Sequence, residues 1–167
     1  MTVTPVPKPG VQERILLHLR DYVDHAEKVE VPFALSQMGI ANAVSIARSN
    51  VPRAISGLRD QGYLLEKQAH VTGVSRKRKA YFLTDEGAKL ADDIWSKVGK
   101  QSVRVIGKDG RASNMELAEA LENTDLPLRH VDVIRYLDDS GTIDLSILSA
   151  DLIERDLSKH IEKQLVT

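Results

Sequence analysis

The most chemically distinctive cluster in the sequence is a run of four consecutive cations, Arg76 to Lys79, directly before the apolar run Ala80 to Leu83. Cations at such a density can bind the phosphate groups of a nucleic acid, since neutralised phosphates release counterions and so favour binding. A basic turn can equally keep an edge strand from pairing with a neighbouring chain. Both interpretations predict an exposed, basic loop beside a strand.

No other grouping of residue types predicts catalysis or a metal site. The chain contains no cysteine, which excludes a disulfide framework, a thiol nucleophile and a Cys-based zinc site. Residues 107–110, Gly-Lys-Asp-Gly, lack the flanking residues of a phosphate loop. We therefore expect a protein that is not an enzyme and needs no cofactor. The histidines are scattered without metal-ligand spacing, at His18, His25, His70, His130 and His160.

The charges are unevenly distributed, although the formal net charge is only −1. Between Arg48 and Lys79 eight basic residues accompany two acidic ones, whereas from Ser113 to Thr167 twelve acidic residues accompany five basic ones. An even scatter of charge is the usual solubility pattern. The middle of the chain is therefore expected to face an anionic partner, and its C-terminal part is not.

The first ten residues, MTVTPVPKPG, contain three prolines and no apolar core. They do not match a signal peptide, and no later stretch has the uncharged apolar length needed to span a bilayer. We expect a flexible arm at residues 1–10, no membrane partner and a cytoplasmic protein.

Apolar residues at three- and four-residue steps predict three helices: Val11 to about Ala26, Ser36 to Val44, and Arg48 to Gln61. The third has the clearest buried stripe, and Pro52 fits its first turn if Ser49 is the N-cap. Gly62 is expected to end this helix in a left-handed conformation.

Two apolar runs, residues 63–71 and 79–84, predict a β-hairpin whose tip carries the cations. Thr84 is expected to cap a fourth helix that extends to Val98, with acidic residues in its first turn as the helix dipole favours.

Beyond Val98 the sequence predicts a strand with a tight turn, then a helix opened by a capping box at Ser113–Glu116, and another helix at 127–139. A final helix is expected from about Ser149. One apolar face of this helix is expected to pair two copies of the chain in a homodimer. Its residues are Ala150, Ile153, Leu157, Ile161 and Leu165.

The predicted order of helices and hairpin is that of a winged helix-turn-helix. Residues 39–64, GIANAVSIARSNVPRAISGLRDQGYL, resemble the helix-turn-helix of MarR-like regulators, and residues 76–91, RKRKAYFLTDEGAKLA, resemble their wing and following helix. The resemblance covers residues 11–98. Ser45 stands where that family usually has Gly, in the left-handed turn between two helices.

The resemblance implies a mainly α fold with a small β-hairpin wing (α+β), and sequence-specific binding of double-stranded DNA by a transcriptional regulator. The third helix would enter the major groove, and the wing would lie on the backbone or in the minor groove. The helix would contribute Arg48, Ser49, Asn50, Pro52, Arg53 and Ser56, and the wing Arg76, Lys77, Arg78 and Lys79. Asn50 could instead only cap the helix, and Arg53 could be an ordinary exposed arginine.

Residues 101–167 are expected to form a smaller, acidic, mostly helical C-terminal domain for dimerisation or sensing, where an effector or partner protein would bind. Two alternatives stay open. The winged helix could bind a protein instead of DNA. The wing also resembles segments that precede NTPase domains in long archaeal signalling proteins, so the chain could be the N-terminal module of a larger protein.

Overall fold

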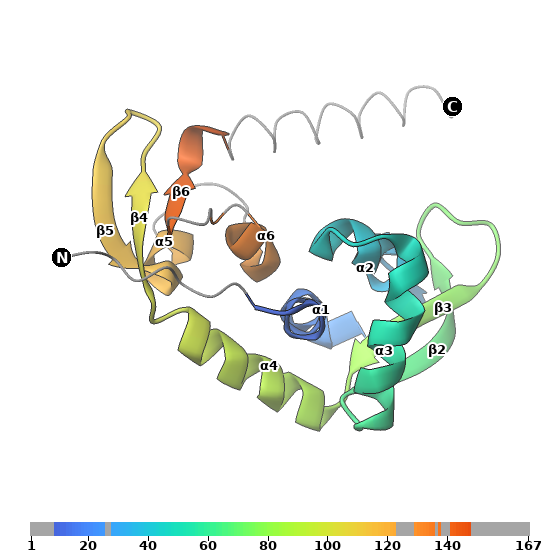
Figure 1. Ribbon diagram of the computed structural model, residues 1–167. Helices are drawn as coiled ribbons and strands as arrows, with labels where there is room; N and C mark the ends of the chain where they lie inside the picture. The colour runs from blue at the N-terminus through green and yellow to red at the C-terminus, as the bar shows by residue number, and fades with distance from the viewer. Residues whose placement is uncertain (1–8, 26–27, 123–128, 136, 138–140, 148–167) are drawn as a thin grey trace, which may run out of the picture.

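The computed structural model describes residues 9–25, 28–122, 129–135, 137 and 141–147 (Figure 1). In the first part of the chain the elements are α1 (Val11–Arg20), η1 (Val23–His25), β1 (Glu30–Val31), η2 (Phe33–Leu35), α2 (Gln37–Val44), η3 (Arg48–Asn50), α3 (Val51–Asp60), β2 (Leu64–Val71), β3 (Arg78–Leu83) and α4 (Asp85–Val98). The second part contains β4 (Ser102–Ile106), β5 (Ala112–Glu116), α5 (Leu117–Glu122), α6 (His130–Arg135) and β6 (Thr142–Asp144).

Helix α1 is the centre of the fold and contacts α2, α3, α4 and α6 (Figure 1). The five consecutive residues Ile15 to Leu19 of this helix are all buried, including His18. The Nε2 atom of His18 lies 2.8 Å from the carbonyl oxygen of Ala34 and hydrogen-bonds to it. The order of helices and hairpin is that of a winged helix, so the predicted fold class is confirmed.

The first helix is shorter than predicted. It ends at Arg20, and Asp21 is its C-cap. Tyr22, in the turn between α1 and η1, still packs against the core, whereas Val23 in η1 is exposed. Periodicity alone could not distinguish one long helix from a helix followed by a 3-10 turn.

Local signals set the limits of the next helices. The Ser36 hydroxyl accepts a hydrogen bond from the Gly39 N–H at 3.1 Å, and the Thr84 hydroxyl accepts one from Gly87 at 3.0 Å. These N-caps satisfy amides that have no partner inside the helix. Gly39 is required by a close approach, because a Cβ there would lie 2.1 Å from the carbonyl oxygen of Phe33.

Ser45 ends α2 in the left-handed conformation, with φ 59° and ψ 50°. This is the turn in which the resemblance implied a glycine. A side chain is strained in this region, because its Cβ approaches the following carbonyl oxygen. The turn of the helix-turn-helix therefore adopts the left-handed conformation with local backbone strain at Ser45.

The wing is the hairpin formed by β2 and β3, with cross-strand partners from Leu64↔Leu83 to Ala69↔Arg78. The short strand β1 pairs in parallel with the far end of β2, which gives the order β1-β2-β3. The tip of the wing is the turn between Val71 at the end of β2 and Arg78 at the start of β3.

The second part of the chain differs from the prediction in two places. The predicted helix from Ser113 to about Glu122 begins only at Leu117, as α5, because residues 112–116 form β5 and pair with β4. Residues 142–144 form β6, a parallel partner of β4, so the expected hairpin of β4 and β5 is extended to a three-stranded sheet of order β5-β4-β6. Side chains from this sheet, α5 and α6 extend the same buried core: Val103, Val105, Leu117, Val131, Ile134 and Ile143.

Candidate nucleic-acid interface

The third helix has one buried and one exposed side. Val51, Ile55 and Leu58 face the core. The predicted contact residues lie on the other side: Arg48, Ser49, Asn50, Pro52 and Arg53 are exposed and Ser56 is half-buried. The helix can therefore present its first turn to a partner without unfolding.

The start of this helix differs in detail from the prediction. Arg48–Asn50 form the 3-10 turn η3, and Asn50, not Ser49, is the N-cap of α3, with Pro52 in the first turn. The Asn50 side chain accepts no capping hydrogen bond. Its amide is therefore available for contacts outside the molecule, which removes the simplest argument that Asn50 serves only as a cap.

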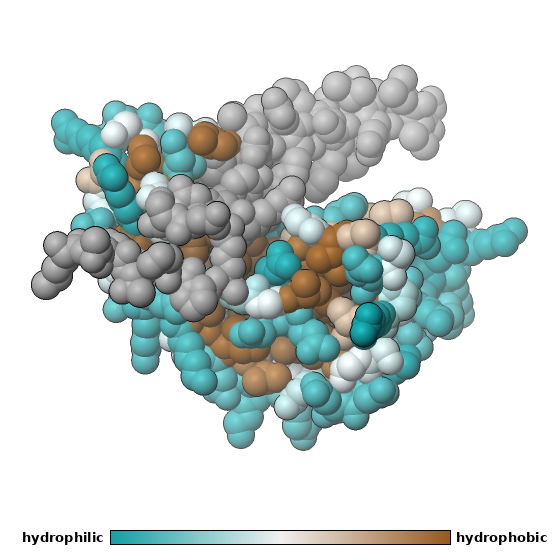
Figure 2. All heavy atoms as spheres, viewed as in Figure 1, coloured by the Kyte–Doolittle hydropathy of each residue, from teal (hydrophilic) through white to brown (hydrophobic). Residues whose placement is uncertain are grey.

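The four cations of the wing are all exposed. Arg76 and Lys77 belong to the turn, and Arg78 and Lys79 begin β3. Arg20, Arg59 and Arg111 each pair with a carboxylate, whereas no described acidic side chain pairs with any of the four wing cations. The wing end of the molecule, at the right of Figure 2, presents hydrophilic residues on the face in view.

A groove of about 500 Å³ lies between the wing and α2, and Arg48 of η3, the turn directly before α3, also lines it, whereas Asn50 and Arg53 do not. Arg48, Lys77, Arg78 and Lys79 all line it, so residues from two distant parts of the sequence meet in one concave, basic surface. Its other lining residues are Phe33, Ser36, Gln37, Met38, Gln68 and Val74. No sequence signal indicated that Phe33 and Met38 would be exposed there, 41% and 37% respectively.

Beside this groove lies the hydroxyl of Tyr81, a residue of β3 that is only 1% exposed. Burial raises the pKa of Tyr81, and the hydrogen bond donated by Gln37 partly opposes that rise. The hydroxyl is therefore protonated near neutral pH and can donate a hydrogen bond.

A second polar cluster, which no sequence pattern indicated, joins α6 to α1 and α4. His130 Nδ1 lies 2.7 Å from Asp21 Oδ1, and its Nε2 lies 3.1 Å from Arg20 Nη1. Arg20 also pairs with Asp92, and the His130 ring packs edge-on against Trp95 with centroids 4.4 Å apart. Arg20 and Asp21 lie more than one hundred residues before His130 in the sequence, and Asp92 and Trp95 lie between 35 and 38 residues before it. No local sequence pattern could therefore reveal the cluster.

The predicted dimerisation residues Ile153, Leu157, Ile161 and Leu165 lie outside the described residues. Over the described ranges, no group of three or more His, Cys, Asp or Glu side chains could hold a metal ion. None of the helices in those ranges is long and apolar enough to cross a bilayer.

No protein-family model matches the sequence, and no curated protein matches it. Solved structures with similar folds include ZitR of Lactococcus lactis, a zinc-responsive MarR family member, at 21% identity over 57% of this chain and 57% of that chain, with a TM-score of 0.40. The Staphylococcus aureus regulator MepR in complex with DNA aligns at 20% identity over 53% of this chain and 65% of that chain, with a TM-score of 0.41.

A variant of ZitR aligns over 96% of this chain and 77% of its own, at 18% identity and a TM-score of 0.43. In other alignments with ZitR and MepR the match spans about half of the known chain, 55% and 56%. The family named among these structures is the one that the sequence resembles. The winged-helix fold of this chain follows from its own element order.

Proposed function

We propose that this chain is a sequence-specific, double-stranded DNA-binding transcriptional regulator. The observation that carries the proposal is the shared groove: Arg48, in the turn before the third helix, and the basic wing expose cations on one concave surface. An α-helix fits the major groove of B-DNA, and a wing beside it reaches the flanking backbone.

The residues divide into two roles. Arg53 and Asn50 are suited to read bases, because Arg can bond a guanine and Asn an adenine through two hydrogen bonds each. Arg48, Ser49, Pro52 and Ser56 would contact bases or phosphates beside them. Arg76, Lys77, Arg78 and Lys79 would bind the phosphate backbone or the minor groove without reading sequence.

The remaining parts of the proposal rest on sequence patterns. Residues 1–10 would be a flexible arm, residues 11–98 the DNA-binding domain, and residues 101–167 an acidic domain for dimerisation or sensing, with an effector or partner protein bound there. The protein would act as a cytoplasmic homodimer without catalytic activity, since paired half-sites match a two-fold symmetric protein.

The alternative is that the winged helix is an interaction module of a larger signalling protein. The unpaired cations favour DNA, because a protein-binding winged helix has no need of a basic wing. Selection of bound fragments from genomic DNA, followed by footprinting, tests the proposal. An enriched sequence protected over paired half-sites supports it, and failure to retain any DNA at low salt contradicts it.

A further inference from the structure

The hydroxyl of Tyr81 links the wing to the second helix. Gln37 Nε2, in the first turn of α2, donates a hydrogen bond to Tyr81 Oη at 3.0 Å. Tyr81 Oη in turn donates to Glu66 Oε1 at 2.9 Å. Glu66 is the cross-strand partner of Tyr81 in the hairpin. The two strands of the wing are therefore joined to α2 through one buried oxygen atom.

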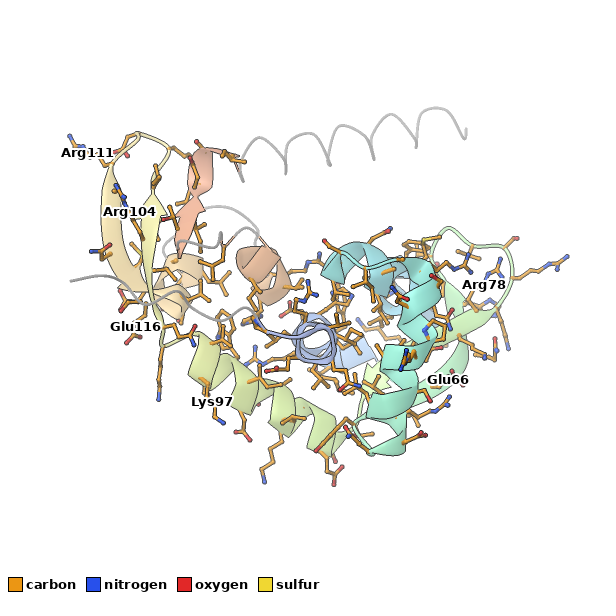
Figure 3. The ribbon with its side chains drawn as sticks, viewed as in Figure 1. Glu66, Arg78, Lys97, Arg104, Arg111 and Glu116 are labelled. Carbon is orange, nitrogen blue, oxygen red and sulfur yellow. The ribbon has the colours of Figure 1, made fainter. Side chains whose placement is uncertain are left out.

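Glu66 extends this link to the third helix. Its second oxygen, Oε2, lies 3.5 Å from Nη1 of Arg59, in the last turn of α3. Glu66, labelled in Figure 3, lies beside α3 and away from the wing tip, near which Arg78 is labelled. One chain of four side chains, Gln37, Tyr81, Glu66 and Arg59, thus connects α2, β3, β2 and α3.

The ring and the hydroxyl of Tyr81 have separable roles. The ring is buried, and a phenylalanine would fill the same space. The hydroxyl adds directional bonds, which fix the relative placement of three elements better than apolar contact does. Its raised pKa keeps the proton that it donates to Glu66.

Simultaneous contact with DNA requires that α3 and the wing keep a fixed separation and angle, because the groove and the backbone beside it are rigidly related. We propose that Tyr81 is a positioning residue for DNA binding, whose hydroxyl holds the wing relative to α3 through Gln37, Glu66 and Arg59. The inference rests on the proposed DNA-binding function. Tyr81 itself is buried and touches no DNA.

A double-mutant cycle tests this role, with affinity measured by fluorescence anisotropy on a duplex selected from genomic DNA and on a random-sequence duplex. Tyr81→Phe is combined with Arg78→Ala, which removes a wing contact. If the hydroxyl acts by placing the wing, Tyr81→Phe weakens binding about fivefold when Arg78 is present and less than about twofold when Arg78 is absent. A structural role alone would leave the effect equal in both backgrounds.

The matched control is Tyr63→Phe, which removes a tyrosine hydroxyl from the separate groove between α1, α3 and α4. This variant is expected to bind both duplexes like the unmodified protein. Equal fold-changes for Tyr81→Phe in the two Arg78 backgrounds, or no change in either, would overturn the inference while the proposed function stands. Failure of the unmodified protein to bind either duplex would instead refute the proposed function, and the inference with it.

Thermal unfolding of each variant shows whether it is folded at the temperature of the assay. If Tyr81→Phe does not fold, Glu66→Ala replaces it in the cycle, because it breaks the same link and leaves the buried ring in place. Glu66→Ala is then expected to weaken DNA binding less in the Arg78→Ala background than when Arg78 is present. Equal fold-changes in affinity in the two backgrounds would again overturn the inference.

Discussion

Arg48 and Arg78 line the same groove, although the whole of α3 and β2 lies between them in the sequence. One comes from the turn that begins the third helix and the other from the first residue of β3. A single duplex that contacts one of these cations lies close to the other. The two residues are nevertheless expected to differ in what they recognise.

Arg78→Ala should weaken binding to specific and random DNA alike. Loss of one phosphate contact should lower the slope of log K against log salt by about 1, because fewer counterions are released. Anisotropy titrations at several salt concentrations measure both quantities. Arg111→Ala is the matched control, since this exposed arginine lies in the opposite hairpin, far from Arg78 in Figure 3. If Arg78→Ala binds like the control, the basic run is a solvated turn.

Ser45→Gly should stabilise the protein by about 1 kcal/mol, since glycine adopts positive φ without the steric conflict of a Cβ. For a chain of this size that corresponds to a rise of about 2–4 °C in Tm. Asn42→Gly, at an exposed position inside α2, is the control and should lower stability instead. An unchanged or lower Tm for Ser45→Gly would show that Ser45 is not strained.

His130→Ala should lower the free energy of unfolding by about 1–3 kcal/mol, because it leaves the half-buried carboxylate of Asp21 without its ring partner, although Arg20 keeps its pairing with Asp92. Urea unfolding followed by circular dichroism provides the measurement. The control variant His70→Ala, at an exposed position of β2, should change the free energy of unfolding by no more than about 0.5 kcal/mol. Equal losses for the two variants would mean that the cluster at α6 contributes nothing specific.

Leu157→Asp should convert a dimer to a monomer, because a carboxylate would be buried in the predicted apolar pairing face. Sedimentation velocity at tens of micromolar protein distinguishes the two states. Ser158→Asp introduces the same charge off that face and should remain dimeric. A monomeric unmodified protein at this concentration would refute the dimer proposal.

The helix-turn-helix and the wing could be predicted from the sequence because their signals are local. The caps at Ser36 and Thr84, the glycine at Gly62 and the apolar runs of the hairpin are each local to the element or boundary that they indicate. The exposed contact residues of the third helix could be predicted from the apolar periodicity, because the buried stripe of α3 determines which side of the helix faces solvent.

The second sheet could not be predicted in this way. Ser113 and Glu116 carry the spacing of a capping box, but the pairing of β5 with β4 overrides that local preference. Strand β6 depends on a parallel partner far back in the chain, and the His130 cluster depends on α1. The link through Tyr81 likewise joins four elements, whose proximity only the folded structure reveals.

The most direct test of DNA recognition is the effect of Arg53→Ala on a selected operator compared with a random duplex. A lost bidentate base contact should cost about 1–3 kcal/mol, confined to one operator position. Anisotropy on both duplexes should therefore show a loss of about five- to more than a hundredfold on the operator and a much smaller loss on random DNA. Equal losses on both duplexes would contradict base reading by the third helix.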